Sequence, residues 1–333
     1  KMGLIKYVMS LMNAARLGIG AQSVGLCEAA YREALKYAHE RRQFGKPIVQ
    51  FAAVSEMLSN MKAKLQGARA LLYETTRFVE IYKQYTHISH ERPLEGTERQ
   101  EMKFYNRLAD GFTPLVKLFS SEYANQLAYD AIQIHGGSGF MKDYPCERLY
   151  RDARIMNIYE GTSQLQVVAA INAVTKGTFM EQIERYAAGE YVEGMQPVVA
   201  KLRELTAKFA EMIAHVEAGE KEVGGFKDFH ARRLVETAGH IIITYRRERG
   251  VRGFGPHLRQ AGRGQDRRGP RLRDELDARG CRTLPQGDPH GGVLIPAGIS
   301  EKRPASRGKA GLFLSRETEP AGTPEGKPPA GPA

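Results

Sequence analysis

Apolar side chains recur every three or four residues over most of the first 245 positions, the spacing of one buried face of an α-helix. The first such run extends from about Leu11 to His39, and the second extends from Val54 to about Tyr82. A third run, from Met102 to Ala131, contains Pro114, which predicts a kink or a break. The pattern therefore predicts three long helices.

Turn-forming residues separate these runs and place a fourth helix. Gly45 and Pro47 interrupt the pattern after the first run, a polar segment with Pro93 follows the second, and the Gly-rich HGGSGF ends the third. Pro145 suits the first turn of a short helix. Thr162 or Ser163 suits the N-cap of the fourth. We expect its buried face to consist of Leu165, Val168, Ala169 and Asn172.

Four antiparallel helices can bury their apolar faces against one another. The pattern over residues 1–177 therefore predicts an all-α, four-helix up-and-down bundle. Shorter helical patterns follow over residues 178–245, where Pro197 opens one helix and Gly224 and Gly225 separate it from the next. We interpret this part as an additional helical region whose last helix is truncated.

The composition changes abruptly after Tyr245. Residues 246–333 hold 16 of the 35 Gly, 11 of the 16 Pro, and 18 Lys and Arg against 10 Asp and Glu, so they carry most of the net charge of +11. Such a segment cannot bury enough apolar surface to fold, which predicts a disordered tail or sequence from a shifted reading frame. An Arg/Gly-rich nucleic-acid-binding arm is the functional alternative, but Phe254 and Phe313 are its only aromatic residues. We expect no nucleic-acid partner.

The remaining composition excludes several classes of protein. Cys27, Cys146 and Cys281 form no Cys-x-x-Cys pair, so we expect no disulfide framework, zinc site or iron–sulfur cluster. This use of cysteine is typical of a reduced thiol protein, so we expect it to be cytoplasmic. No apolar stretch reaches the roughly 18 residues of a membrane-spanning helix, so we expect no membrane span. The chain begins at Lys1, in what reads as the middle of a segment. We therefore expect the native start of the protein to lie upstream of Lys1.

Three stretches are poor material for a helix core and lie at predicted helix ends: ERRQFGKPI, QIHGGSGF and IYEGTSQLQ. Each has a plain structural interpretation by itself. Arg41 can offset the helix dipole, Gly136 and Gly137 can end a helix, and Glu160 can follow the preference for acidic residues near a helix start. His135 by itself is typical of a plain loop histidine.

Taken together, in this order and spacing, the three motifs resemble the C-terminal helical domain of the acyl-CoA dehydrogenases. The resemblance covers about residues 2–176, and residues 178–245 resemble the extra C-terminal helical region of a long-chain subgroup. The N-terminal helical domain and the middle β-domain of that family are not in this chain. We therefore expect a C-terminal part that is inactive by itself.

The resemblance implies FAD-dependent α,β-dehydrogenation of an acyl-CoA thioester, with electrons passing to an electron-transferring flavoprotein. It implies a homodimer or homotetramer formed largely through this bundle. Glu160 matches the catalytic base that removes the α-proton. The positions that match substrate contacts are Asn13, Arg16, Tyr159 and Gly161.

The resemblance also implies a set of flavin contacts. Arg41 and Phe44 match residues that reach the FAD of a neighbouring subunit. The other matching positions are Gln133, Ile134, His135, Gly136, Gly137, Thr162 and Gln164. One departure is Ala52, where the family has Gln, so one hydrogen bond to the flavin is lost or replaced.

Two alternatives to a dehydrogenase stay open from the sequence. An acyl-CoA oxidase shares the bundle and the base but passes its electrons to oxygen. A non-catalytic helical interaction module with a basic nucleic-acid-binding arm belongs to another class.

Overall fold

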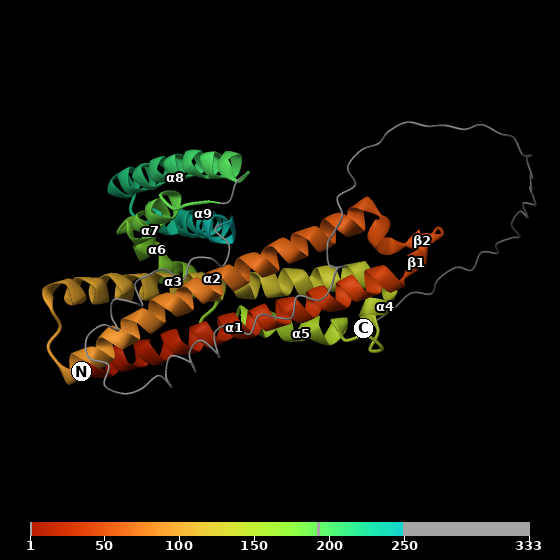
Figure 1. Cartoon of the computed structure of the whole chain (residues 1–333), viewed down its shortest axis with the longest axis horizontal. Coiled ribbons are helices and arrows are strands. Elements are labelled where there is room, and N and C mark those ends of the chain that lie inside the picture. Colours follow the sequence, from red (N-terminus) through yellow and green to blue (C-terminus); the bar gives the residue numbers. More distant parts are fainter. Residues whose placement is uncertain (1, 192–193, 249–333) are drawn as a thin grey trace, which may run out of the picture. The chain divides into compact units, whose positions relative to one another are not determined.

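Three long helices form the bulk of the computed structural model, which describes residues 2–191 and 194–248. They are α1 (Met2–Glu40), α2 (Ala52–Glu91) and α3 (Gly96–His135), and they pack against one another along their lengths (Figure 1). At 1.5 Å per residue each is about 60 Å long. The all-α class predicted from the spacing of apolar residues is confirmed.

Helix α3 lies at the centre of the bundle. It contacts α1 and α2, and also the shorter helices α5 (Cys146–Met156) and α6 (Ser163–Thr175) that complete the bundle. Its predicted apolar positions Leu108, Phe112 and Leu115 are fully buried. Of the kink or break predicted at Pro114, the break is wrong, because α3 continues through this residue. Burial on several sides outweighs the one backbone hydrogen bond that a proline removes.

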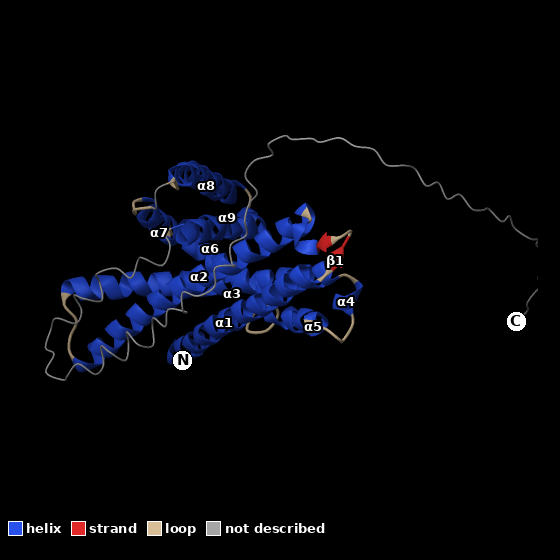
Figure 2. Ribbon diagram, turned by 45° about the vertical axis from the view of Figure 1, so that its right-hand side comes forward, coloured by secondary structure: helices blue, strands red, loops and turns tan. Residues whose placement is uncertain are grey.

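Small elements occupy one end of the bundle. Strands β1 (Arg42–Gln43) and β2 (Lys46–Pro47) form an antiparallel pair that leads into the 3-10 helix η1 (Ile48–Gln50). Figure 2 shows this strand pair at the same end as the short helix α4 (Gly137–Phe140). The ends of α1 and α3 therefore bring two of the three sequence motifs together.

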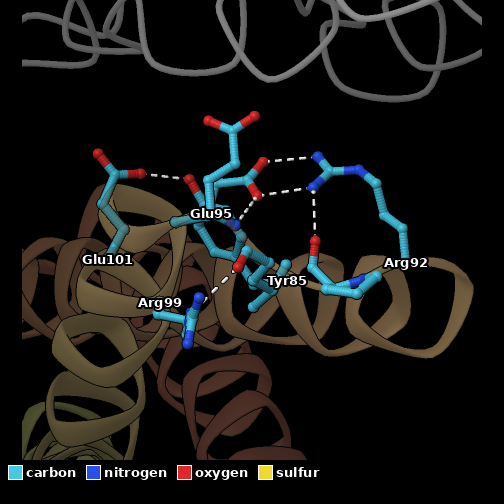
Figure 3. A network of polar contacts seen from close by, with 8 residues as sticks. Tyr85, Arg92, Glu95, Arg99 and Glu101 are labelled. Atoms are coloured by element: carbon cyan, nitrogen blue, oxygen red, sulfur yellow. Dashed lines mark hydrogen bonds and ion pairs between the residues drawn. The ribbon is translucent and has the colours of Figure 1, made fainter.

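The corner between α2 and α3 differs from the prediction, since α2 continues past Tyr82 to Glu91 and α3 begins at Gly96. A polar network holds this corner (Figure 3). The Nη1 and Nη2 of Arg92 donate to the carboxylate of Glu98, at 2.8 and 2.7 Å, and Glu98 also accepts from the backbone N–H of Glu95 at 2.9 Å. This capping box satisfies N–H groups at the start of α3 that no intrahelical partner can reach.

The additional helical region consists of α7 (Thr178–Ala187), α8 (Gln196–Glu222) and α9 (Phe226–Glu248). Pro197 lies in the first turn of α8, and α9 begins directly after Gly224 and Gly225, as predicted. Helix α9 packs against α2, α6 and α8. The tail predicted from position 246 begins too early, since α9 continues to Glu248, and the rest of it lies outside the described residues from position 249 onwards.

The buried face predicted for the fourth helix is wrong. Leu165 and Val168 of α6 are 54% and 63% exposed, whereas the neighbouring positions Gln166 and Val167 are buried. Both sides of α6 carry apolar residues, so the period alone does not choose between them. Two polar side chains at its N-terminal end, Ser163 and Gln166, face inward and set the rotation of the helix.

Candidate active site

Glu160 lies in a tight turn between α5 and α6. Its backbone φ is 54°, and that of Gly161 is 92°, so two successive residues adopt left-handed conformations. A non-glycine residue adopts this conformation rarely and at a free-energy cost. Thr162 is the N-cap of α6, as predicted, and its side chain accepts a hydrogen bond from the N–H of Leu165 at 3.5 Å.

Two buried side chains bind the carbonyl groups of this turn. The Nζ of Lys117 on α3 donates to the Gly161 carbonyl at 2.7 Å, and the Nε2 of Gln166 donates to the same oxygen at 2.8 Å. Gln166 also donates to the Glu160 carbonyl at 3.3 Å. Neither residue stands out in the sequence motifs. A lysine inside the apolar run LVKLF was the available signal.

Arg16 of α1 lies beside the same turn. Its side chain is 6% exposed, and its Nη1 donates to the Oδ1 of Asn13 at 3.2 Å. Burial lowers the pKa of Arg16, while the charge of Glu160 acts in the opposite direction. The structure thus brings together four residues that the sequence analysis selected: Asn13, Arg16, Glu160 and Gly161.

The absence of a side chain at position 161 has a steric reason. A Cβ at Gly161 would lie 2.8 Å from the Nε2 of Gln166 and 3.8 Å from the Nη2 of Arg16. The space that a side chain would fill is therefore occupied by groups that hold the turn.

Tyr159 faces α1 across the turn. Its hydroxyl donates to the Oε1 of Gln22 at 2.5 Å. Burial, and secondly the charge of Glu160, raises the pKa of the phenol. The carboxylate of Glu160 itself belongs to an exposed residue. The Glu160 backbone N–H makes no hydrogen bond within the described part of the chain, and this N–H is therefore available to a ligand.

The second group of candidates lies at the far end of α1. In the β1–β2 turn, Phe44 has a φ of 50° and is 91% exposed, and Gly45 has a φ of 81°. Arg42 is committed to the turn, because its Nη2 donates to the Gly45 carbonyl at 2.9 Å. The side chain of the neighbouring Arg41 is exposed and forms no hydrogen bond or ion pair with any residue that the structure describes, whereas its backbone is hydrogen-bonded to Tyr37 and Ile48.

His135 is the last residue of α3 and is buried, so the interpretation as a plain loop histidine is wrong. Its ring stacks on Tyr37 of α1 with centroids 4.2 Å apart, and its Nδ1 lies 2.7 Å from the Ala131 carbonyl. Burial lowers its pKa. The hydroxyl of Tyr37 donates to Ser138 at 3.4 Å, so this aromatic pair ties the loop after α3 to the end of α1.

The backbone of that loop is open. Gly136 has φ 61° and ψ −140°, a combination that glycine adopts readily and other residues avoid. Apart from the neighbouring residues in the chain, no atom of the described residues lies within 4 Å of the position of a Cβ at Gly136 or at Gly137. Of the neighbouring candidates, Gln133 is exposed and Ile134 is buried.

The two groups of candidates are far apart within one chain. Arg16 and Arg41 are separated by 25 positions along α1 and the residue after it, which corresponds to roughly 37 Å at the rise of an α-helix. The structure therefore does not bring Arg41 and Phe44 to the same place as Glu160, Thr162 and Gln164.

Two further findings concern other kinds of site. Among the described residues, no cluster of three or more His, Cys, Asp or Glu side chains has the arrangement of a metal site. Within the same part of the chain, no helix combines the length and apolar character needed to cross a membrane.

The helical fold agrees with the comparison of the sequence with known families. Residues 5–175 match the acyl-CoA dehydrogenase C-terminal domain, and residues 175–246 match a second domain described as acyl-CoA dehydrogenase C terminal. The first match alone covers half of the chain. The chain belongs to the acyl-CoA dehydrogenase family.

Individual relatives match over the bundle. The chain is 38% identical over 168 residues to a 3-(aryl)acrylate reductase of Clostridium sporogenes, a match that covers 50% of this chain and 38% of the relative. It is 39% identical over 158 residues to subunit CarC of the caffeyl-CoA reductase-Etf complex of Acetobacterium woodii, covering 47% and 35%.

A solved structure extends the similarity beyond the bundle. An acyl-CoA dehydrogenase from Bacillus anthracis in complex with FAD has a TM-score of 0.54 and 26% identity, covering 72% of this chain and 40% of that one. The chain thus spans well under half the length of these relatives.

Proposed function

We propose that this chain supplies the catalytic base of a FAD-dependent acyl-CoA dehydrogenase, and that Glu160 is that base. The observation that carries the proposal is the geometry of the turn at Glu160, where an accessible carboxylate and an uncommitted backbone N–H belong to the same residue. The α-carbon of a thioester is a weak acid. Removal of its proton therefore requires donors aimed at the thioester oxygen as negative charge develops there.

The surroundings of the turn suit that task. Arg16 places a buried cation beside it, which would favour an enolate oxygen over a neutral carbonyl. Asn13 and Arg16 would contact the CoA thioester, and Tyr159 and Gly161 would line the acyl group. Glu160 would take the α-proton while the β-hydrogen leaves as hydride, so that a carbon–carbon double bond forms.

FAD, when bound, supplies the acceptor for that hydride. The exposed residues fit a dinucleotide, since Arg41 offers an unpaired guanidinium to a pyrophosphate, and Gly136 and Gly137 leave room for close approach of a ligand to the backbone. Phe44 would add an aromatic surface. Gln133, Ile134 and His135, the last residues of α3, would form the rest of that contact, and Thr162 and Gln164 would contact the flavin near the base.

The two groups of flavin candidates serve different FAD molecules in this proposal. A separation of roughly 37 Å along α1 exceeds the length of an extended dinucleotide. Arg41 and Phe44 therefore act on the FAD of a neighbouring subunit, which requires a homodimer or homotetramer.

The proposed electron acceptor is an electron-transferring flavoprotein. One relative is a subunit of a reductase-Etf complex, which supports this choice over oxygen. The same observation favours a second candidate function, reduction of an α,β-unsaturated acyl-CoA, because both relatives described above carry the name reductase. That the enzyme is cytoplasmic stays a prediction that cell fractionation can test.

Anaerobic mixing of the FAD-loaded natural gene product with a series of saturated acyl-CoA thioesters tests the proposal. We expect the flavin absorbance to bleach with at least one of them and to return on addition of electron-transferring flavoprotein. Rapid return with oxygen alone would indicate an oxidase. Oxidation of the pre-reduced enzyme by enoyl-CoA, with no bleaching by any saturated thioester, would indicate a reductase.

A further inference from the structure

The turn that carries Glu160 is held from two sides by side chains that neither the substrate nor the flavin assignment uses. We propose that Lys117 and Gln166 are positioning residues, which clamp the two peptide groups after Glu160 and thereby fix the direction of its carboxylate. This inference rests on the proposed function of Glu160 as the base.

The contacts come from two different helices. Lys117 reaches the Gly161 carbonyl from α3, across 44 positions of sequence, and Gln166 reaches both the Glu160 and Gly161 carbonyls from α6. Each peptide plane that follows Glu160 is therefore bound at its oxygen. Backbone held in this way can keep a left-handed conformation that is unfavourable by itself.

Lys117 is placed as a hydrogen-bond donor. Its side chain is fully buried, and within the described residues it has no carboxylate at ion-pair distance, so its one short contact is the Gly161 carbonyl. The nearest acidic residue on α3, Glu122, accepts instead from the hydroxyl of Ser163. A buried ammonium is unfavourable unless hydrogen bonds or opposite charges compensate it, which argues against a role as filler.

Gln166 is oriented by the same two carbonyl groups. Its Nε2 donates to both, while its Oε1 is buried and has no partner among the described residues. Leaving a buried acceptor unsatisfied is unfavourable. The side-chain amide of Gln166 thus donates to the carbonyl groups of the turn, while its own oxygen accepts no hydrogen bond from the described residues.

The charges around Lys117 make the clamp sensitive to pH. Burial, and secondly the charge of Arg16 on α1, lowers the pKa of Lys117 to about 8, while Glu122 on α3 and Glu160 in the turn oppose this shift. The sequence of α6 contains no ionisable side chain. Above pH 8 the amine becomes neutral, and its hydrogen bond to the carbonyl weakens.

Two substitutions test the clamp. Lys117→Met and Gln166→Met keep the length and volume of the side chain but remove its donors. Lys103→Met is the matched control, because Lys103 lies on the same helix and is exposed. Amide hydrogen exchange of the chain over residues 157–162 reports on the turn without any activity. Single-turnover flavin reduction in the FAD-loaded enzyme reports on the base.

We expect Lys117→Met and Gln166→Met to accelerate exchange in the turn and not in α2 or α8. We expect flavin reduction at saturating acyl-CoA to slow by on the order of ten- to a hundredfold, as for a misplaced catalytic group, with less than about a twofold change in acyl-CoA affinity. The difference in exchange between wild type and Lys117→Met should shrink as pH rises through about 8. Lys103→Met should match wild type in every measurement.

The proposal would be overturned if either folded variant showed both the wild-type rate of amide exchange in the turn and the wild-type rate of flavin reduction. If Lys117→Met does not fold, Gln166→Met decides. Failure of the proposed function is a separate result: a wild-type enzyme that never reduces its flavin would refute the role of Glu160, whereas the exchange measurement would still report whether the turn is clamped.

Discussion

The hydroxyl of Tyr186 on α7 donates to the Oε1 of Glu74 on α2 at 2.8 Å, and both side chains are buried. Arg77 forms an ion pair with the same carboxylate at 2.9 Å, and Arg246 of α9 forms another at 3.1 Å. One glutamate of the bundle thereby joins it to two helices of the additional region.

Glu74→Gln should destabilise the chain by about 3 kcal/mol, because it leaves two guanidinium groups without the charge that compensates them. Tyr186→Phe removes one neutral donor and should cost about 1 kcal/mol. Glu56→Gln, at an exposed position of α2, should change stability by less than about 0.5 kcal/mol. Urea unfolding of the three variants measures these differences, and equal stability of Glu74→Gln and Glu56→Gln would contradict the account.

Acid should weaken the same network. Burial by itself would raise the pKa of Glu74, but hydrogen bonds from Arg77 and Tyr186 and the charges of both arginines outweigh burial and hold the pKa below the ordinary 4.5. A depressed carboxyl pKa contributes stability that is present above the unfolded value and is lost as pH falls through the folded value. Between pH 7 and pH 3, wild type should therefore lose more stability than Glu74→Gln.

Gly161→Ala should impair the turn for two reasons. The residue has a left-handed φ of 92°, and a Cβ would lie 2.8 Å from Gln166. Gly225→Ala is the control, since Gly225 has a φ of 86° but open space around a Cβ. Both should lose about 1–2 kcal/mol to backbone strain. Only Gly161→Ala should also slow flavin reduction, and a normal rate in that variant would show that the turn tolerates displacement.

Gly239→Ala should loosen α9. A Cβ at this position would lie 2.2 Å from the ring of Phe119 on α3, so helix or ring must shift, at a cost of about 1–3 kcal/mol. Gly25→Ala, on an open face of α1, should instead stabilise the chain by up to about 1 kcal/mol. Thermal unfolding of Gly239→Ala and Gly25→Ala measures the change in melting temperature of each variant. A change of the same sign in both variants would mean that α9 does not pack closely on α3.

Co-expression of an Arg41→Ala chain with a Glu160→Gln chain tests whether flavin contacts cross between subunits. A mixed dimer contains one site with both defects and one site in which the base and the arginine are intact. Activity should therefore exceed that of either variant alone. Arg42→Ala, which alters an arginine committed to Gly45, is the control for Arg41→Ala and should retain FAD. No recovery in the mixture would place Arg41 and Glu160 of the same chain at one flavin.

The long helices could be predicted because their apolar residues repeat over many turns, as at Leu108, Phe112 and Leu115. The end of α2 could not, because its polar last turns rely on contacts such as that between Tyr85 and Glu101 of α3. The buried face of α6 was not predicted for a related reason. The side chain of Gln166 points inward because it donates a hydrogen bond to the Gly161 carbonyl, and not because it belongs to an apolar face.

Some residues of the candidate site could also be predicted from the sequence, and others could not. Glu160, Gly161 and Arg16 could be predicted, because these residue types stand out at helix ends or match the family. The lysine within LVKLF marks a buried position, but the partner of Lys117 and the stacking of His135 on Tyr37 involve residues 44 and 98 positions apart, which no local pattern reports. Residues that hold a site through long-range contacts therefore emerge only from the fold.

The rate of flavin reduction in Glu160→Gln tests the central claim most directly. The substitution keeps the shape of the side chain and removes its ability to take a proton, in an exposed residue on which the fold does not depend. In single-turnover mixing of the FAD-loaded enzyme with saturated acyl-CoA, we expect the variant to retain FAD and bind the thioester but to reduce flavin at least about a thousandfold more slowly. Reduction at the wild-type rate would contradict the assignment of Glu160 as the base.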